Sequence, residues 1–256
     1  MTLALHDLYI GYAEDAHRHI VADALNASLP KGVMACLVGA NGVGKSTLMR
    51  TLSGFQPALR GEVCIDGRRI EEYTPRELSE RVGVVLTERE GAPDLTVEEV
   101  VAIGRMPYTN FWGTLTAADR HAVDEAIALV GIEPLRYKKI GRVSDGERQK
   151  AMIAKALAQQ TGIILLDEPT AFLDYGSKVS VMRLLRRLAH EQGKSILLST
   201  HDLEIAFQTT DEVWILQRDG LQTGTLDALE QGGAVSAFLA ASGLHYEAEN
   251  RRIVLF

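Results

Sequence analysis

The stretch that decides the fold is Val38-Gly39-Ala40-Asn41-Gly42-Val43-Gly44-Lys45-Ser46-Thr47. It fits the G-x-x-x-x-G-K-[ST] phosphate-loop pattern at Gly39, Gly44, Lys45 and Ser46. An apolar run at 33–38 predicts a strand before the loop, and a helix is expected to begin near Lys45. Glycines let backbone amides curl around phosphate oxygens, the lysine adds a full charge, and the serine hydroxyl can ligate Mg²⁺. The stretch therefore predicts a site for a nucleotide with Mg²⁺.

Composition narrows the class of protein around this loop. The chain has 256 residues, 46% hydrophobic and 24% charged, as in ordinary globular proteins, so we expect a single domain over 1–256. A net charge of −7 argues against a surface that coats nucleic acid. No apolar run approaches the roughly 18 residues that cross a bilayer, and residues 1–7 lack the basic start of an export signal. These features favour the cytoplasm.

The order of predicted elements indicates an α/β fold. Short strands are predicted near the N-terminus, a mainly helical stretch follows, and helices and strands then alternate. Such alternation is typical of a mostly parallel sheet with helices on both faces. The predicted strands are 3–12, 33–38, 61–65, 82–86, 163–166, 195–199 and 212–216, and the predicted helical segments lie within 95–140, 144–159 and 177–192. The Asp66-Gly67 turn after 61–65 predicts antiparallel β pieces near the N-terminus.

Two adjacent carboxylates, Asp167 and Glu168, follow the apolar strand 163–166. A parallel strand places its carboxyl end near the phosphate loop. Asp167 is then expected in the Mg²⁺ shell, while Glu168 faces the γ-phosphate and orients or deprotonates the attacking water. The alternative is a strand that ends in a solvated turn, but it gives no purpose to the second acid.

A second motif, Val143-Ser144-Asp145-Gly146-Glu147-Arg148-Gln149, opens the helix predicted at 144–159. Ser144 and Glu147 form an S-x-x-E capping box, which suffices as a structural explanation. In combination with the phosphate loop, the acidic pair, residues 171–174 and residues 199–202, however, the motif resembles the signature of ATP-binding-cassette (ABC) ATPases. The resemblance covers about residues 3–225. Within that family, residues 104–108 and the helix at 115–132 resemble importers of iron chelates, haem or cobalamin.

The resemblance implies a fold and a set of roles. It implies a phosphate-loop NTPase core at 1–86 and 141–256, with a helical subdomain inserted at 87–140. It implies that Lys45, Glu168 and His201 are catalytic, with His201 contacting the γ-phosphate, and that Tyr12 stacks on adenine. The implied metal-site residues are Ser46, Asp167 and Thr87. The implied nucleotide contacts are Tyr12, Gly39, Asn41, Gly42, Gly44, Lys45, Ser46, Thr47, Ser144, Gly146 and Asp174.

The same resemblance implies partners. Two chains would sandwich two ATP molecules, with the signature of one chain and its Asp174 completing the site of the other. A polytopic permease would dock near residues 87–112 and place the chain at the cytoplasmic face of the inner membrane, with a solute-binding protein as an indirect partner. We also expect the chain to bind no nucleic acid. A soluble ABC ATPase and a phosphate-loop small-molecule kinase are the alternative functions.

The sequence differs from the family pattern at two places, and each difference leads to a prediction. Thr87, followed by Glu88, stands where the family has a glutamine that touches Mg²⁺ or the lytic water, so either Thr87 works through a bridging water or Glu88 shares the role. Asp145 and Glu147 stand where the signature has glycine and glutamine. Carboxylates there repel an incoming triphosphate unless they point away, which predicts a weaker ATP sandwich.

The expected docking surface is rich in aromatic and apolar groups around Pro107. An exposed patch of this kind, rimmed by charge, is typical of a protein partner. The alternative is that the aromatic side chains close the core of the helical subdomain. The residues concerned are Arg105, Met106, Pro107, Tyr108, Phe111 and Trp112.

Overall fold

The computed structural model describes residues 2–14, 17–86, 93–110, 112–218, 220–241, 243–247 and 252–255. Its strands are β1 (Leu3–Glu14), β2 (His17–Leu29), β3 (Met34–Val38), β4 (Arg60–Ile65), β5 (Arg68–Arg69), β6 (Val82–Val85), β7 (Ile163–Leu166), β8 (Ser195–Ser199), β9 (Glu212–Gln217), β10 (Gly220–Gly224), β11 (Leu244–Glu247) and β12 (Arg252–Leu255). Its α-helices are α1 (Lys45–Leu52), α2 (Pro75–Ser79), α3 (Val97–Ile103), α4 (Ala117–Val130), α5 (Asp145–Ala158), α6 (Tyr175–Gln192), α7 (Leu203–Thr209), α8 (Leu226–Gln231) and α9 (Ala234–Ala240).

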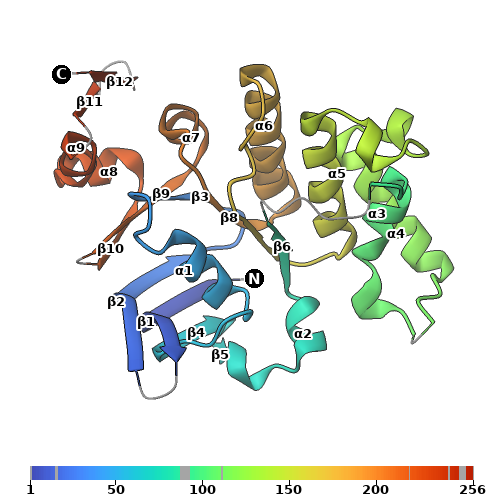
Figure 1. Cartoon of the computed structure of the whole chain (residues 1–256), viewed down its shortest axis with the longest axis horizontal. Coiled ribbons are helices and arrows are strands. Elements are labelled where there is room, and N and C mark those ends of the chain that lie inside the picture. Colours follow the sequence, from blue (N-terminus) through green and yellow to red (C-terminus); the bar gives the residue numbers. More distant parts are fainter. Residues whose placement is uncertain are drawn as a thin grey trace.

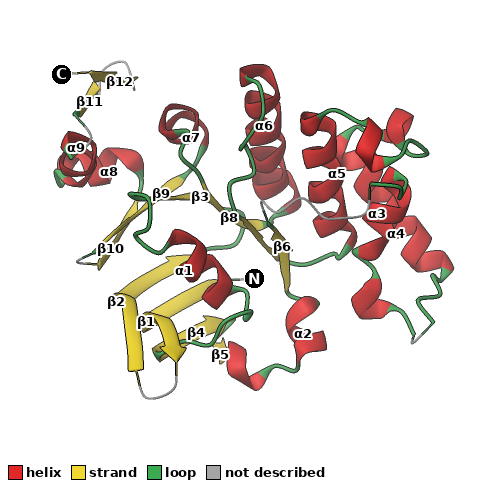
Figure 2. Cartoon of the chain, in the orientation of Figure 1, coloured by secondary structure: helices red, strands yellow, loops and turns green. Residues whose placement is uncertain are grey.

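The central sheet has the order β10-β9-β3-β8-β7-β6 and is parallel from β9 to β6 (Figures 1 and 2). Its strands are apolar runs because both faces are covered. Cys36 and Val38 of β3 belong to the buried cluster that includes α5 and α6, whereas Ala35 and Leu37 belong to the cluster that includes α1 and the N-terminal strands. The predicted mostly parallel sheet is confirmed.

The N-terminal sheet has the order β2-β1-β4-β5 and is antiparallel. Side chains on one of its faces pack with α1 against the central sheet, which makes the second buried cluster. The predicted antiparallel pieces are therefore confirmed at 3–14 and 60–69, including the turn at Asp66-Gly67. Strand β2 was not predicted, although it makes the longest edge of this sheet.

The helical subdomain contains α3 and α4, which pack beside α5 at the end of the molecule farthest from β10 (Figure 1). Capping boxes begin both helices, Thr96 with Glu99 and Thr116 with Asp119, at the two starts expected from the sequence. Apolar side chains of α3 and α4 join the same buried cluster as α5, α6 and the central sheet. The domain boundaries given above therefore stay a prediction.

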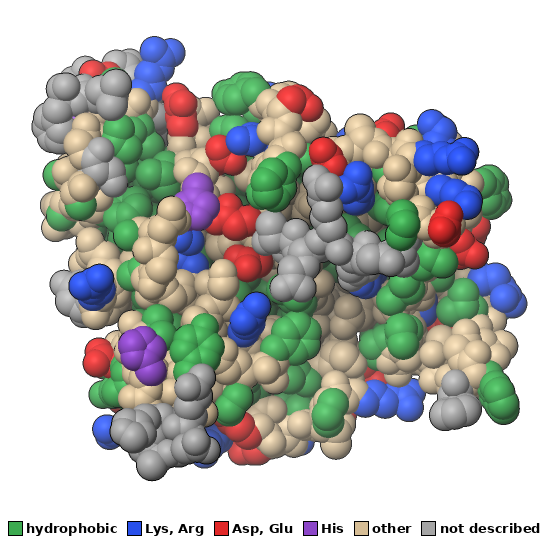
Figure 3. Space-filling view, in the orientation of Figure 1, with side chains coloured by type: hydrophobic (Ala, Val, Ile, Leu, Met, Phe, Trp, Pro, Cys, Tyr) green, Lys and Arg blue, Asp and Glu red, His purple; other side chains and the backbone are tan. Residues whose placement is uncertain are grey.

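The C-terminal part packs beside β9 and β10. Helices α8 and α9 contact these strands, and the β11–β12 hairpin rests on α9, with Tyr246 edge-on to Phe207 of α7. Among the described residues, no helix combines the length and the apolar content needed to cross a bilayer. Lys and Arg side chains on the face shown in Figure 3 are scattered among acidic and uncharged ones.

Candidate nucleotide site

The phosphate loop joins the buried strand β3 to α1, as the sequence predicts. Gly44 caps α1 with φ of 113°, a left-handed conformation, and a Cβ there would lie 2.5 Å from Val21 Cγ1. A Cβ at Gly39 would lie 2.5 Å from the Leu216 carbonyl oxygen. These two positions therefore require glycine, and the loop stays close to the sheet.

Lys45 lies under the loop, with only 7% of its surface exposed. Its Nζ donates to the Gly39 carbonyl at 2.9 Å and to the Ala40 carbonyl at 3.3 Å. Burial lowers the pKa of Lys45, and the charges of Glu168 and Asp167 oppose that shift. The ammonium is thus held between the loop carbonyls and the two acids that follow β7.

The acidic pair reaches this region across one intervening strand, because β8 lies between β3 and β7. The hydroxyl of Ser199, at the end of β8, donates to Asp167 Oδ1 at 2.6 Å. The same hydroxyl oxygen accepts the Glu168 amide at 2.9 Å. Ser199 therefore orients both acids, a role that its place in the Ser199-Thr200-His201 run could have signalled, but that we did not assign from the sequence.

Glu168 and His201 meet directly, with Glu168 Oε1 3.0 Å from His201 Nε2. Glu168 has φ of 50°, which turns it sharply away from the strand. Burial raises the pKa of Glu168, and the charges of His201 and Lys45 oppose the shift. A cavity of about 400 Å³ is lined by both the phosphate loop and His201. The predicted catalytic residues Lys45, Glu168 and His201 are thus brought together.

Tyr12 and the start of α1 form the outer part of the site. The Tyr12 hydroxyl lies 3.0 Å from Thr47 Oγ1, while 43% of the Tyr12 surface stays exposed. Thr47 is buried, so its hydroxyl is engaged with Tyr12. Ser46 is exposed one residue before it.

Ser144, Gly146 and Asp174 gather at a second place. Asp174 caps α6 by accepting the Ser177 amide at 3.0 Å and the Ser177 hydroxyl at 2.7 Å. A Cβ at Gly146 would lie 2.8 Å from Ser177 Oγ, so the first turns of α5 and α6 touch. Helix α5 lies well apart from α1 in Figure 1. Ser144, Gly146 and Asp174 do not line the cavity at the phosphate loop.

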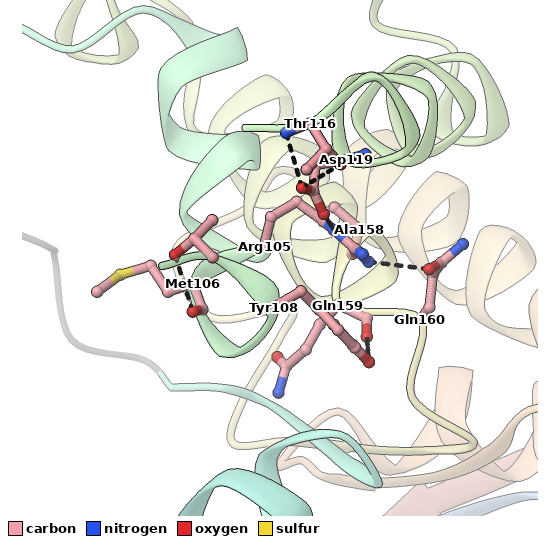
Figure 4. Close-up of polar contacts among 9 residues, drawn as sticks. Arg105, Met106, Tyr108, Thr116, Asp119, Ala158, Gln159 and Gln160 are labelled. Carbon is pink, nitrogen blue, oxygen red and sulfur yellow. Dashed lines mark hydrogen bonds and ion pairs between the residues drawn. The ribbon is translucent and has the colours of Figure 1, made fainter. Parts of the chain in front are cut away.

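The stretch expected to dock a partner is only partly exposed. Met106 and Trp112 expose 66% and 84% of their surface. Arg105, in contrast, is buried, and its guanidinium lies 3.9 Å from the ring centre of Tyr108, whose hydroxyl donates to the Gln159 carbonyl (Figure 4). Arg105 therefore does not belong to an exposed docking patch, because Asp119, the Ala158 carbonyl and Gln160 accept its hydrogen bonds. Thr87, Glu88 and Phe111 lie outside the described residues.

The chain is similar in sequence to known ATP-binding proteins of transporters. A family model described as ABC transporter matches residues 22–171. The ferric enterobactin transport ATP-binding protein FepC of Escherichia coli is 37% identical over 199 residues, 78% of this chain and 72% of that protein. The iron(3+)-hydroxamate import ATP-binding protein FhuC of Bacillus subtilis is 36% identical over 205 residues, 80% of this chain and 75% of that protein.

Solved structures share the fold. An inward-facing ABC transporter assigned to the metal-chelate type superposes with a TM-score of 0.80 at 23% identity, over 99% of this chain and 95% of that one. A dimeric bacterial ABC transporter cassette superposes with a TM-score of 0.74 at 25% identity, over 88% of this chain and 98% of that one. With its phosphate loop, acidic pair and histidine assembled at one edge of the sheet, the chain belongs to the ABC transporter family and is an ABC-type ATPase.

Proposed function

We propose that the protein is the ATP-hydrolysing subunit of an importer that takes up an iron-siderophore, haem or cobalamin-type solute through a separate permease. The names of its relatives support the solute class, since FepC and FhuC serve ferric enterobactin and iron(3+)-hydroxamate. A cobalamin import protein of Halobacterium salinarum is 34% identical over 77% of this chain, although the match spans only 49% of that protein. The proposal that this chain hydrolyses ATP rests on one observation, the contact between Glu168 and His201 close to Lys45.

ATP would be bound at the loop and at Tyr12. Amides of the loop and the N-terminal end of α1 would receive the phosphates, and the Lys45 ammonium would turn from the Gly39 carbonyl to a phosphate oxygen. The exposed ring of Tyr12 would stack on adenine. Its hydroxyl contact to Thr47 fixes the ring next to the loop.

The donor set fits Mg²⁺. Ser46 offers an exposed hydroxyl, and Asp167 offers a carboxylate whose other contact, the Ser199 hydroxyl, fixes its orientation. When bound there, Mg²⁺ would neutralise charge on the β- and γ-phosphate oxygens. Ser46 and Asp167 would hold it, and Thr87 is the third residue assigned to it from the family pattern.

Glu168 would take a proton from the attacking water. Burial raises its pKa toward the working pH, which favours a general base. His201 would contact the γ-phosphate, and its Nε2 lies 3.0 Å from Glu168 Oε1. Ser199 keeps the Glu168 backbone in place through its hydrogen bond to the amide.

Ser144, Gly146 and Asp174 would complete the site of a second chain. They are gathered around Ser177, away from α1, so they are left for a nucleotide that is not held by their own chain. ATP would then be bound between two copies related by a two-fold axis. The dimeric cassette among the similar structures supports this arrangement.

A permease helix would occupy a groove formed by the N-terminal part of the chain, β6 and the residue that follows α5. A cavity of about 480 Å³ is lined there by Phe55, Tyr73, Leu78, Val84 and Gln159, among others. Phe55 exposes 65% of its surface. Val84 belongs to β6, which ends just before Thr87, so a helix in this groove would lie next to the predicted docking stretch.

The direct test of the enzymatic part is Glu168→Gln. This change keeps the size and most contacts of the side chain but removes the base, so hydrolysis should slow by roughly 10² to 10⁴ while ATP binding persists. Glu204→Gln, an exposed residue on α7, is the matched control and should hydrolyse ATP like the parent protein. Near-normal turnover in Glu168→Gln would remove this residue from the role.

A further inference from the structure

Arg105 joins three segments that are far apart in the sequence (Figure 4). Its Nε donates to Asp119 Oδ1 at 2.9 Å, at the start of α4. Its Nη1 donates to the Ala158 carbonyl at 2.7 Å, at the last residue of α5, and to Gln160 Oε1 at 2.9 Å. The side chains of Arg105 and Asp119 are only 6% and 4% exposed. The contacts make a buried joint between the helical subdomain and the end of α5.

Tyr108 and Gln159 extend the joint toward the groove. The Tyr108 hydroxyl donates to the Gln159 carbonyl at 2.9 Å, and the ring of Tyr108 covers the Arg105 guanidinium. The Gln159 side chain donates to the carbonyls of Ser79, at the end of α2, and Val82, at the start of β6. Gln159 also lines the groove itself. The end of α5 is therefore tied to the helical subdomain through Tyr108 and to the lining of the proposed permease site through Gln159.

The chemistry of the joint suits the end of a helix. The last carbonyls of an α-helix have no partner within the helix and carry a partial negative charge. Arg105 supplies a buried cation to one of these carbonyls from another segment. A lysine would keep the charge but not the planar fork that reaches Asp119 and Ala158 together.

The other end of α5 carries Ser144. Helix α5 has 14 residues, so its two ends are about 21 Å apart. A straight helix acts as a rod, and its direction depends on how both ends are held. The N-terminal end rests on Ser177 through Gly146, and the C-terminal end is held by Arg105.

We propose that Arg105 is a positioning residue for α5: by holding the C-terminal end of the helix, it sets the direction in which Ser144 is presented to the nucleotide of a second chain. Arg105 does not line the cavity at the phosphate loop, and its side chain contacts Asp119, Ala158, Gln160 and the ring of Tyr108. The inference rests on the proposed function, because it requires an ATP site shared by two copies. Occupation of the groove would reach α5 through Gln159 and the same joint.

The test separates nucleotide binding from dimer formation. Arg105→Lys is made in the Glu168→Gln protein, and two quantities are measured: the affinity of the monomer for a fluorescent ATP analogue, and the dissociation constant of the dimer in ATP and Mg²⁺ by sedimentation. We expect the dimer constant to rise about tenfold or more, while the monomer affinity stays within about twofold. Arg120→Lys, an exposed arginine next to Asp119, is the matched control and should leave both unchanged.

A second variant, Tyr108→Phe, tests the inference if the Arg105→Lys protein does not fold. Tyr108→Phe keeps the ring over Arg105 and removes only the hydrogen bond to Gln159, so it should raise the dimer constant several-fold without changing ATP affinity. A folded Arg105→Lys or Tyr108→Phe protein that dimerises like its parent would overturn the inference. Equal losses of ATP affinity and of dimerisation would also overturn the inference, because such losses indicate that the variant is destabilised as a whole. A parent protein that stays monomeric in ATP overturns the proposed function itself.

Discussion

The carboxylate of Glu147 occupies both donors of Ser144. The Ser144 amide donates to Glu147 Oε2 at 2.8 Å, and the Ser144 hydroxyl lies 3.0 Å from the same oxygen. The Ser144 amide contributes most to lowering the pKa of Glu147, so the group stays charged at neutral pH. Asp145 is paired with Arg148 at 3.1 Å and is thereby partly neutralised. Of the two acids expected to weaken the ATP sandwich, Glu147 is the one that competes with a phosphate for the donors of Ser144.

Glu147→Gln should therefore tighten the ATP-bound dimer. Glutamine preserves the capping box but removes the charge, which corresponds to about 0.5 to 1 kcal/mol near a helix N-terminus, a several-fold lower dimer dissociation constant. Glu77→Gln is the control, since it changes the same capping position on α2. Sedimentation in ATP and Mg²⁺ measures both variants, and a dimer no tighter than the parent would speak against a role for this charge.

Sequence motifs predict the residues of the nucleotide site, but they do not predict the buried residues that hold the surrounding helices in place. Lys45, Glu168 and His201 could be found because each follows a strand or opens a helix in a spaced motif. The burial of Arg105 could not be predicted, because its partners lie at the start of α4 and at the end of α5, which only the fold brings together.

Strand β2 shows the same limit at the scale of elements. Its buried residues are Ala22, Leu25 and Leu29, a spacing that breaks the alternation of a regular strand. The cause is an irregular pairing with β1, where Ala24 and Asp7 adopt φ of 49° and 44°. By contrast, β7, β8 and α1 have the predicted positions because their apolar runs and flanking glycines are local signals.

Asp119, at the start of α4, should make the free energy of unfolding decrease at acid pH. Hydrogen bonds from the Thr116 hydroxyl and amide, followed by Arg105, lower the pKa of Asp119 to about 2. A carboxyl whose pKa is lower in the folded state stabilises the protein above its unfolded value of about 4. This contribution is lost as the pH falls from about 4 toward 2.

Asp119→Asn removes that dependence and should also destabilise the protein at pH 7, because it leaves Arg105 buried without a counter-ion. We expect the free energy of unfolding, from urea titrations at pH 7, 4 and 3, to fall more steeply with acid in the parent than in the variant. Asp124→Asn, on the exposed side of the same helix, is the control. Parallel profiles for the parent and Asp119→Asn would contradict this account of the pKa.

At the scale of the whole molecule, the exposed part of the docking stretch can be separated from the buried part. Tyr108→Asp would disturb the buried part as well, since it would remove the ring that covers Arg105 and place a carboxylate there. Met106→Asp changes an exposed side chain and should leave folding and ATP binding intact but abolish assembly with the permease and solute uptake.

Tyr137→Asp is the control for Met106→Asp, because Tyr137 is exposed to a similar degree and lies outside the stretch 87–112. Co-purification with the permease and uptake of labelled solute measure both variants. If Met106→Asp assembles and transports like the parent, the permease docks elsewhere.

At the scale of the whole molecule, α5 lies apart from α1, and we propose that ATP is enclosed by two copies of the chain. The most direct measurement is sedimentation velocity of the Glu168→Gln protein with and without ATP and Mg²⁺. We expect a monomer without nucleotide and a dimer with it, and a gain in stability of about 2.7 kcal/mol at a hundredfold excess of ATP over its dissociation constant. A monomer that persists at saturating ATP and high protein concentration would contradict this proposal.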